Sequence, residues 1–474
     1  MRLQPRARSA AIAAFGLAAA LCLCAPYSLA PRAVAQQPTA ATPGRKLTAR
    51  VVAPIEGYEG PSGYTRRPAL VAFGPGGRLL ALSAPRHTVR VVDTATGRLR
   101  YTLSTAQKGG LSAFSFSPDG DYLATRDAVD RTVRLWDAAT GTQRAALVGR
   151  RRNLETKHKE KTLPVEEFVT VPVSPDGRVV LSEREDDLVT AFDAATSREM
   201  MTLDHNTESN AVKGALKLFL WNGKVFTLHM SAVYSPDGRR LATANGDKSP
   251  KLWDAATGRL IAELRGHKDR VYHALFSPDS RLFATETTRG TTQLWDAETG
   301  ALRATLRAGE FAHPFFDDDV FPASPSSAFS PDSKTLVTYR TRGAELWDTA
   351  TGALKSAIKD DTDTVSFTPD SRLLATDGDE RASAKLWDVA TGRLVRELPK
   401  PGKRETGFVL FSPDGRVLLT AGDAGVRLWD VATGELLSTL DRSRQPARFS
   451  PDGRLLATGG TKKTAMLYEL SAQW

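Results

Sequence analysis

The sequence predicts an all-β protein: a single closed β-propeller of nine four-stranded antiparallel blades. Two repeated signatures support this. Ser-Pro-Asp-Gly or a near copy recurs nine times, with its proline at 75, 118, 175, 236, 278, 331, 369, 413 and 451. Leu-Trp-Asp or a degraded copy follows each of them after a short apolar run. A repeat of about 40 residues built from short strands and turns is typical of radial arrays.

Residues 408–440 illustrate how one repeat becomes a blade. The apolar stretch 408–411 predicts a first strand, and 412–415 ends it in a tight turn, because proline presets one backbone angle and Asp and Gly suit the following positions. Residues 417–419, 426–429 and 435–440 predict three further strands. Large apolar residues fall on both faces of this sheet, so both faces need a neighbouring blade to cover them.

The recurring tryptophans are interpreted as core residues, because they hold one position in successive repeats. They are Trp136, Trp253, Trp295, Trp347, Trp387 and Trp429. The recurring aspartates of Ser-Pro-Asp-Gly resemble an array of acids, but turn chemistry explains all of them. The most conspicuous residues of the repeat are therefore predicted to be structural.

The motifs Phe-Ser-Pro-Asp-Gly, Leu-Ala-Thr, Val-Arg-Leu-Trp-Asp and Ala-Thr-Gly resemble the WD-repeat β-propeller family, in particular exported bacterial members, from about residue 46 to the end. The resemblance implies a hydrogen-bonded network of a Gly-His pair, a strand-two Ser or Thr, a turn Asp and the Trp. Gly266-His267 matches the pair, but Arg289 stands where its Asp belongs. The turn Asp is present in other repeats, as Asp130, Asp247 and Asp423.

The two ends of the repeat region predict how the ring closes. The ninth motif stops near the C-terminus, without room for a fourth strand, while residues 46–53 form an isolated strand pattern. We therefore expect Thr48–Val52 to pair with Ala465–Leu470 and complete the last blade. Nine motifs favour nine blades. Eight blades with one degenerate unit is the alternative, and the first and third motifs, which lack Trp, are the weakest.

The N-terminal residues 1–35 have the pattern of a cleaved signal peptide: a basic start, an apolar run at 10–25 and a small-x-small site at Ala33-Val34-Ala35. Residues 36–45 read as a flexible linker and 46–474 as the propeller. The apolar run is shorter than the ~20 residues that cross a bilayer, so we expect a periplasmic or secreted protein with no transmembrane span in the mature chain. An uncleaved membrane anchor is the alternative.

Composition excludes several kinds of chemistry. Cys22 and Cys24 both lie in the signal segment, so the mature chain has no disulfide, thiolate metal site or cysteine nucleophile. The formal charge of +10 falls to +6 once the four arginines of that segment are removed, which does not indicate nucleic acid. The seven histidines lack zinc-ligand spacing, and no hydrolase elbow or phosphate loop occurs. The sequence thus predicts no catalytic, cofactor or metal site.

Three intervals exceed the basic period: residues 149–163, 206–230 and 309–326. The second contains a hairpin signal around Asn222-Gly223, which either packs on a blade or projects toward a partner. The third is rich in Asp and Phe but lacks the alternating ligands of a calcium loop. The first is a candidate interaction loop, with a solvated loop as the alternative. Its basic residues are Arg150, Arg151, Arg152, Lys157, Lys159 and Lys161.

Two classes of function follow from these observations. The leading hypothesis is a monomeric, non-catalytic, exported scaffold that binds a protein partner or a cell-envelope polymer through loops on one face of the ring. The alternative is a propeller enzyme, quinoprotein-like or a hydrolase, with a site in the central channel that no motif marks.

Overall fold

The structure is a computed structural model of the 474-residue chain. It describes residues 46–56, 71–84, 88–104, 111–127, 132–148, 171–183, 188–204, 218–221, 224–227, 231–244, 249–269, 271–287, 290–307, 327–340, 343–360, 362, 364–377, 384–399, 406–422, 425–441, 443–460 and 464–473. The signal segment, the linker, and the intervals 149–163 and 309–326 therefore lie outside the described residues.

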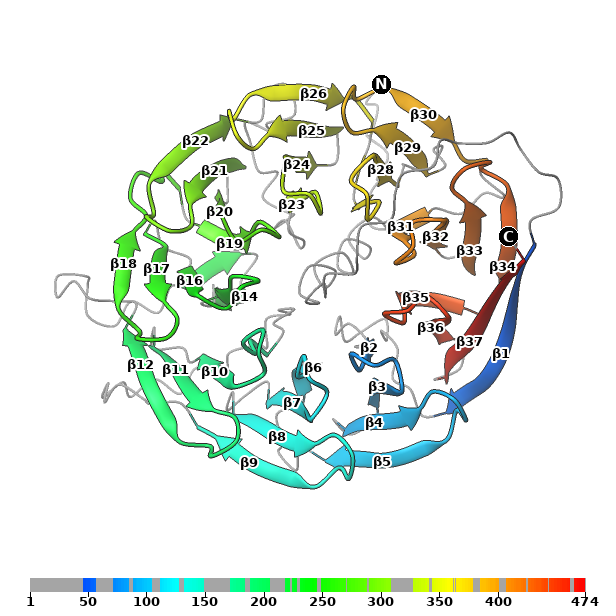
Figure 1. Ribbon diagram of the computed structural model, residues 1–474, viewed down its shortest axis with the longest axis horizontal. Coiled ribbons are helices and arrows are strands. Elements are labelled where there is room, and N and C mark those ends of the chain that lie inside the picture. The colour runs from blue at the N-terminus through cyan, green and yellow to red at the C-terminus, as the bar shows by residue number, and fades with distance from the viewer. Residues whose placement is uncertain are drawn as a thin grey trace, which may run out of the picture.

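Nine antiparallel sheets form a closed ring (Figure 1). Blade 1 contains β2 (Val71–Phe73), β3 (Leu79–Ala84), β4 (Thr88–Asp93) and β5 (Leu99–Ser104). Blade 2 contains β6 (Leu111–Phe116), β7 (Tyr122–Asp127), β8 (Val133–Asp137) and β9 (Gln143–Leu147). Blade 3 contains β10 (Val179–Glu183), β11 (Leu188–Asp193) and β12 (Glu199–Asp204). Blade 4 contains β15 (Ser231–Tyr234), β16 (Arg240–Ala244), β17 (Lys251–Asp254) and β18 (Leu260–Glu263).

The second half of the ring continues the pattern. Blade 5 contains β19 (Val271–Phe276), β20 (Leu282–Thr287), β21 (Thr291–Asp296) and β22 (Leu302–Arg307). Blade 6 contains β23 (Ser327–Phe329), β24 (Thr335–Arg340), β25 (Gly343–Asp348) and β26 (Leu354–Ile358). Blade 7 contains β27 (Val365–Phe367), β28 (Leu373–Thr376), β29 (Lys385–Asp388) and β30 (Leu394–Glu397). Blade 8 contains β31 (Thr406–Phe411), β32 (Val417–Gly422), β33 (Gly425–Asp430) and β34 (Leu436–Leu440).

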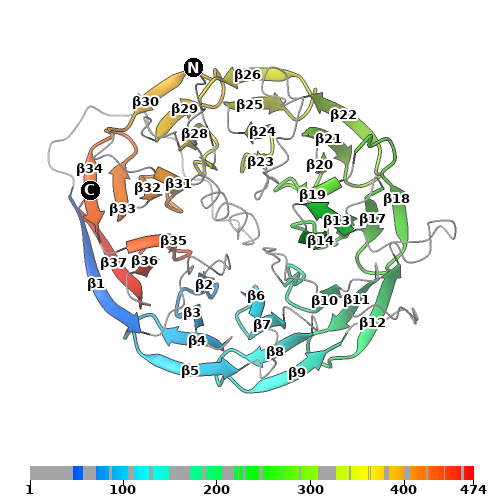
Figure 2. The same cartoon turned by 180° about the vertical axis from the view of Figure 1, so that it is seen from behind.

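Blade 9 contains β35 (Ser443–Phe449), β36 (Leu455–Gly460) and β37 (Thr464–Gln473), and it is completed by β1 (Lys46–Glu56). β1 pairs with β37 in antiparallel register, with Thr48 opposite Ser471 and Ala49 opposite Leu470. The same blade viewed from behind lies between blades 8 and 1 (Figure 2). The predicted closure by the N-terminal strand is therefore confirmed, as is the nine-bladed all-β architecture.

Blade 3 departs from the four-stranded pattern. Its first strand is reduced to one bridge between Val173 and Val180, and the backbone N–H of Leu181 bonds the carbonyl of Pro172. Proline has no N–H to donate, which limits how far this inner strand can extend. The third motif, named above as weak, thus builds an incomplete blade rather than no blade.

The core is a series of layers between adjacent blades. In one of them, Trp295 and Phe283 of blade 5 pack with Leu252 and Leu264 of blade 4. Of the six tryptophans predicted to be core residues, Trp387 is partly exposed and the other five are buried, at 2–7% exposure. Each layer needs side chains from two blades, so a single blade cannot bury its own apolar faces.

In seven blades a glycine in the turn before the outer strand permits a close approach to the neighbouring blade. Gly300 has φ of 73°, and a Cβ built on it would lie 2.2 Å from the Cβ of Ala262 in β18. Gly97 stands in the same relation to Ala53 of β1, at 2.3 Å. Blade 1 therefore packs against β1 as closely as blade 5 packs against the outer strand of blade 4. This holds although β1 comes from the opposite end of the chain to the rest of blade 9.

Removal of β1 should weaken the ring. A chain that begins at residue 55 loses the pairing with β37 and the burial of Leu47, which is 7% exposed and worth about 2 kcal/mol. We expect its melting temperature, measured by circular dichroism, to fall well below that of a chain that begins at residue 46. Equal melting temperatures for the two chains would contradict a structural role for β1.

Substitution of Gly300 by Ala should destabilise the protein by about 3 kcal/mol, because it combines left-handed strain with a clash against Ala262. Gly76→Ala is the matched control, since a Cβ there meets nothing within 4 Å, and we expect a change within about 0.5 kcal/mol. Urea unfolding of the two variants measures both effects. Similar losses in both would show that the interblade contact is not the cause.

Candidate functional site

In the turn that joins the first and second strands of a blade, the aspartate of the motif accepts hydrogen bonds from other residues of the same turn. In blade 8, Ser412 Oγ donates to Asp414 Oδ1 at 2.6 Å, and the backbone N–H of Arg416 donates to the same oxygen at 3.1 Å. The N–H of Val417 in turn donates to Ser412 Oγ at 3.0 Å. The Ser and Asp of the repeated motif therefore hold the turn together, as the sequence predicts.

In blades 5, 6 and 7 a serine replaces the glycine of this turn, and its side chain forms a hydrogen bond to the corresponding turn of the preceding blade. Ser280, Ser333 and Ser371 have φ of 62–63°, an unfavourable region for residues with a side chain. Their Oγ atoms accept hydrogen bonds of 2.9–3.0 Å from the backbone N–H groups of the turn aspartates of blades 4, 5 and 6: Asp237, Asp279 and Asp332. The interblade bond offsets the strain.

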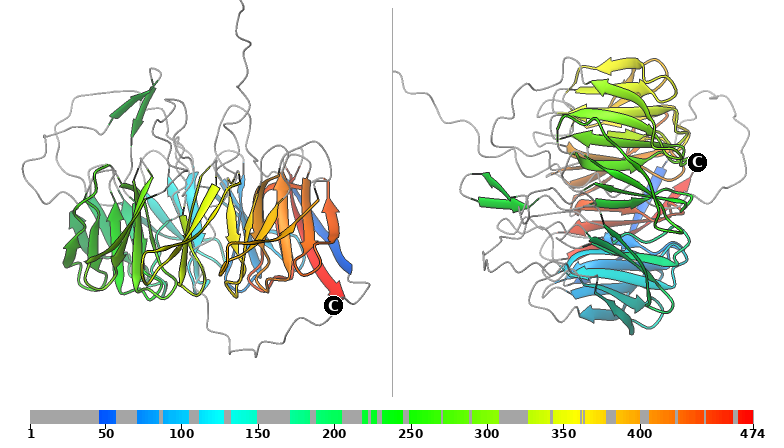
Figure 3. Two further views of the ribbon diagram at one scale, coloured as in Figure 1. Left: turned by 90° about the horizontal axis from the view of Figure 1, so that it is seen from above. Right: turned by 90° about the vertical axis from the view of Figure 1, so that its left-hand side faces the viewer.

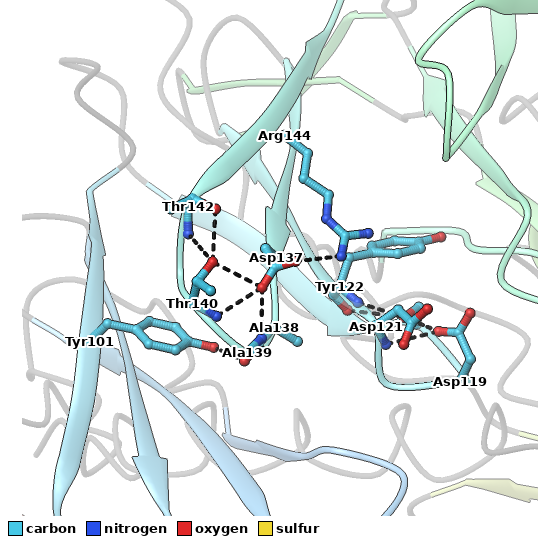
Figure 4. A network of polar contacts seen from close by, with 11 residues as sticks. Tyr101, Asp119, Asp121, Tyr122, Asp137, Ala138, Ala139, Thr140, Thr142 and Arg144 are labelled. Atoms are coloured by element: carbon cyan, nitrogen blue, oxygen red, sulfur yellow. Dashed lines mark hydrogen bonds and ion pairs between the residues drawn. The ribbon is translucent and has the colours of Figure 1, made fainter.

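A second polar turn joins the third and fourth strands, shown for blade 2 in Figure 4. Asp137 Oδ1 accepts hydrogen bonds from the N–H and Oγ1 of Thr140, and Arg144 binds Oδ2 at 2.5 Å. The Arg144 guanidinium, followed by the bonds from Thr140, lowers the pKa of Asp137 to about 2. This carboxylate is therefore ionised and fully engaged near neutral pH, which removes it from acid–base chemistry.

The tryptophan of a complete repeat is held by a strand-two threonine. Its Nε1–H donates to the threonine Oγ1 at 2.9–3.0 Å in six blades: Trp136–Thr125, Trp253–Thr243, Trp295–Thr285, Trp347–Thr338, Trp387–Thr376 and Trp429–Thr420. In blade 5, His267 Nε2 also contacts Thr285 Oγ1 at 2.8 Å. This blade has three of the four implied network members; Arg289 and the turn aspartates named above lie outside the described residues.

Three blades have no tryptophan at this position, and each has different residues in place of the hydrogen-bonded Trp–Thr pair. In blade 1, Leu82 and Val92 replace both polar partners with apolar ones. In blade 3, Phe192 replaces only the donor, and the buried Ser182 Oγ has no hydrogen-bond partner among the described residues. In blade 9, Tyr468 and Thr458 both bond Ser443 Oγ, at 2.7 and 2.9 Å. Nothing in the motif pattern identifies Ser443 in advance.

The ring has two unlike faces. We define the turn face as the side that carries the tight turns between first and second strands and between third and fourth strands, and the loop face as the side where outer strands end and inner strands begin. Each long interval follows an outer strand, β9, β12 or β22, so all three leave from the loop face. The predicted hairpin is present as β13 (Leu218–Trp221) and β14 (Lys224–Thr227), and it stands off this face as a separate sheet (Figure 3).

The six basic residues of the candidate interaction loop, Arg150 to Lys161, lie outside the described residues. Among the described residues, no group of three or more His, Cys, Asp or Glu side chains is placed to hold a metal ion. His273 Nδ1 contacts the buried Glu286 Oε2 at 3.2 Å, a pair that sequence spacing did not indicate. No helix within the described residues is long and apolar enough to cross a membrane.

Comparisons with known proteins agree with this geometry. The family model "WD domain, G-beta repeat" matches residues 97–137, 221–254, 258–296 and 406–430. Autophagy-related protein 16 of Arabidopsis thaliana is 25% identical over 35% of this chain and 34% of its own length. Nuclear distribution protein PAC1 of Arthroderma benhamiae is 26% identical over 43% and 44% respectively. The chain thus spans less than half the length of these curated eukaryotic relatives.

Among solved structures, the C-terminal WD40 domain of Sif2 covers 89% of this chain with a TM-score of 0.53 and 12% identity, which supports the fold alone. The structure shows the chain to be a nine-bladed β-propeller, and four stretches of it are similar to the WD40 repeat model.

The Asp137–Arg144 pair should make the free energy of unfolding depend on pH in the acidic range. Because the pKa of Asp137 is lowered in the folded state, its charge stabilises the protein above about pH 4, and this contribution is lost as the pH falls through the folded-state pKa of about 2. Asp137→Asn keeps the turn hydrogen bonds and removes the charge, so we expect a loss of about 1 kcal/mol at pH 7, reduced by solvent screening. The difference from the unmodified protein should shrink steadily from about pH 4 downward, as the pH approaches and passes the folded-state pKa of about 2. A difference that stays constant over this range, measured by urea unfolding, would contradict the assignment.

Proposed function

We propose that this protein is a non-catalytic, exported scaffold that binds a protein partner or a cell-envelope polymer through the loop face. The observation that carries the proposal is that all three long intervals leave the ring from this one face. Binding residues are commonly found on loops that a rigid scaffold positions. The turn face instead consists of short turns whose Ser and Asp side chains bond one another.

The pattern of residues 1–35 supports export, and the basic loop 149–163 supports a partner with acidic groups. The relatives described above are eukaryotic proteins, so the likeness to exported bacterial members rests on the sequence motifs alone.

A capture experiment tests this function. A chain of residues 36–474, immobilised and exposed to the envelope fraction of its source organism, should retain one partner in stoichiometric amount. Neutralising the basic loop by substitution to Gln should reduce this capture by about tenfold or more, since rim charges set association. The residues changed are Arg150, Arg151, Arg152, Lys157, Lys159 and Lys161.

The matched control changes six cations of the turn face to Gln, with the same loss of charge, and should retain the partner. These are Arg178, Arg239, Arg281, Lys334, Arg372 and Arg416. Equal loss in both variants would contradict binding through the loop face. Capture of no partner, together with turnover of a compound from a metabolite panel, would support a propeller enzyme instead.

A further inference from the structure

The first turn of most blades is electrically neutral at the turn face. Its aspartate and the basic residue two positions later are both exposed in blades 3 to 9. The pairs are Asp176 and Arg178, Asp237 and Arg239, Asp279 and Arg281, Asp332 and Lys334, Asp370 and Arg372, Asp414 and Arg416, and Asp452 and Arg454. Two of them approach as ion pairs, at 4.0 Å between Arg178 and Asp176 and 3.9 Å between Arg454 and Asp452.

Blades 1 and 2 break this balance in opposite directions. Blade 1 has Gly76 in place of the aspartate and keeps Arg78, so its first turn is positive. Blade 2 has Asp119 and also Asp121 where the other blades are basic, so its first turn is negative (Figure 4). Both Arg78 and Asp121 are exposed, and neither forms an ion pair with a described residue. The two unbalanced turns are neighbours in the ring.

An arc of apolar side chains lies at the same end of the blades. One residue of each outer strand lies opposite the strand-three Trp position, and in every blade except blade 9, whose outer strand is β1, it directly follows the second turn. In blades 4 to 9 and blade 1 it is apolar and 37–50% exposed: Leu260, Leu302, Leu354, Leu394, Leu436, Val51 and Leu99. In blades 2 and 3 it is polar, as Gln143 and Glu199.

We infer that the turn face docks a second copy of this chain. A two-fold contact is self-complementary, so each feature must meet its counterpart on an identical surface. A two-fold axis in the plane of the ring, passing between blades 1 and 2 and through blade 6, places blade 1 opposite the partner's blade 2. Arg78 of each copy then lies toward Asp121 of the other copy. The contact thus contains two symmetric pairs of opposite charge.

The same axis brings the part of the apolar arc in blades 4 to 8 onto itself, whereas Leu99 and Val51 lie toward the polar Gln143 and Glu199 of the other copy. Blade 4 opposes the partner's blade 8, blade 5 opposes blade 7, and blade 6 opposes itself. Leu260 therefore lies toward Leu436, Leu302 toward Leu394, and Leu354 toward its own copy. Removing half-exposed leucines from water favours the contact, and the charges fix its register. This assembly differs from the monomer expected from the sequence.

The arrangement has a consequence for function. Back-to-back turn faces leave both loop faces pointing outward, so one dimer presents two copies of the loop face on opposite sides. A partner with repeated sites would then be held at two points, which raises its overall avidity without any new contact. The dimer does not depend on the proposed function, because it uses the opposite face of the ring.

Sedimentation equilibrium of residues 36–474 at low salt tests the dimer. We expect a dimer for the unmodified chain and a dissociation constant raised about tenfold or more in Arg78→Asp and in Asp121→Arg, because each variant places like charges together at two places. An equimolar mixture of the two variants should dimerise again, since Arg78→Asp in one copy then meets Asp121→Arg in the other. A chain that is monomeric at every concentration, or a mixture that does not recover, would overturn the proposal.

A second pair of variants tests the apolar arc independently of charge. Leu394→Ser should weaken the dimer, whereas Val395→Ser should not, since Val395 is equally exposed but its side chain lies on the other side of the strand. Circular dichroism melts confirm that both variants fold. Equal weakening by both substitutions, or by neither, would overturn the assignment of the turn face as the contact.

Discussion

The close approach of each blade to the outer strand of the blade before it is the constraint on which the whole ring depends. A glycine in the second turn permits it, with φ near 70° and no room for a Cβ, as at Gly258, Gly352 and Gly392. Because both faces of a blade are apolar, this spacing decides whether the layer between two blades is filled. Ser197 of blade 3 holds the same backbone shape with φ of 60°, so the geometry survives there without glycine, at a cost in strain.

Much of the fold could be predicted from sequence because each blade is encoded locally. Ser412 to Gly415 form a turn through hydrogen bonds between residues close in sequence. Trp429 identifies the third strand of its blade because tryptophan recurs at that position of the repeat. Ring closure could also be predicted, since the ninth repeat lacks a strand and Thr48–Val52 lacks a partner. Such inferences need only the order of motifs along the chain.

Contacts between blades could not be predicted in the same way, because they depend on the angle and offset of one blade against the next. Ser280 looks like a small variation of a turn glycine, yet its hydroxyl bonds the turn of the blade before it. Ser443 lies outside every motif but joins Tyr468 and Thr458 in blade 9. The candidate interaction loop carries no repeat signal at all, so its placement follows only from the strand β9 that precedes it.

The odd number of blades makes the proposed two-fold contact more specific than it would be in an even ring. An in-plane axis through nine blades must pass through one gap and one opposite blade, and that blade necessarily faces its own copy. A turn with unbalanced charge would repel itself in this position. The axis between the unbalanced blades 1 and 2 falls on blade 6, where Asp332 and Lys334 can each meet the other kind of charge. The positive turn of blade 1, the negative turn of blade 2 and the neutral turn of blade 6 therefore all lie where one two-fold axis requires them.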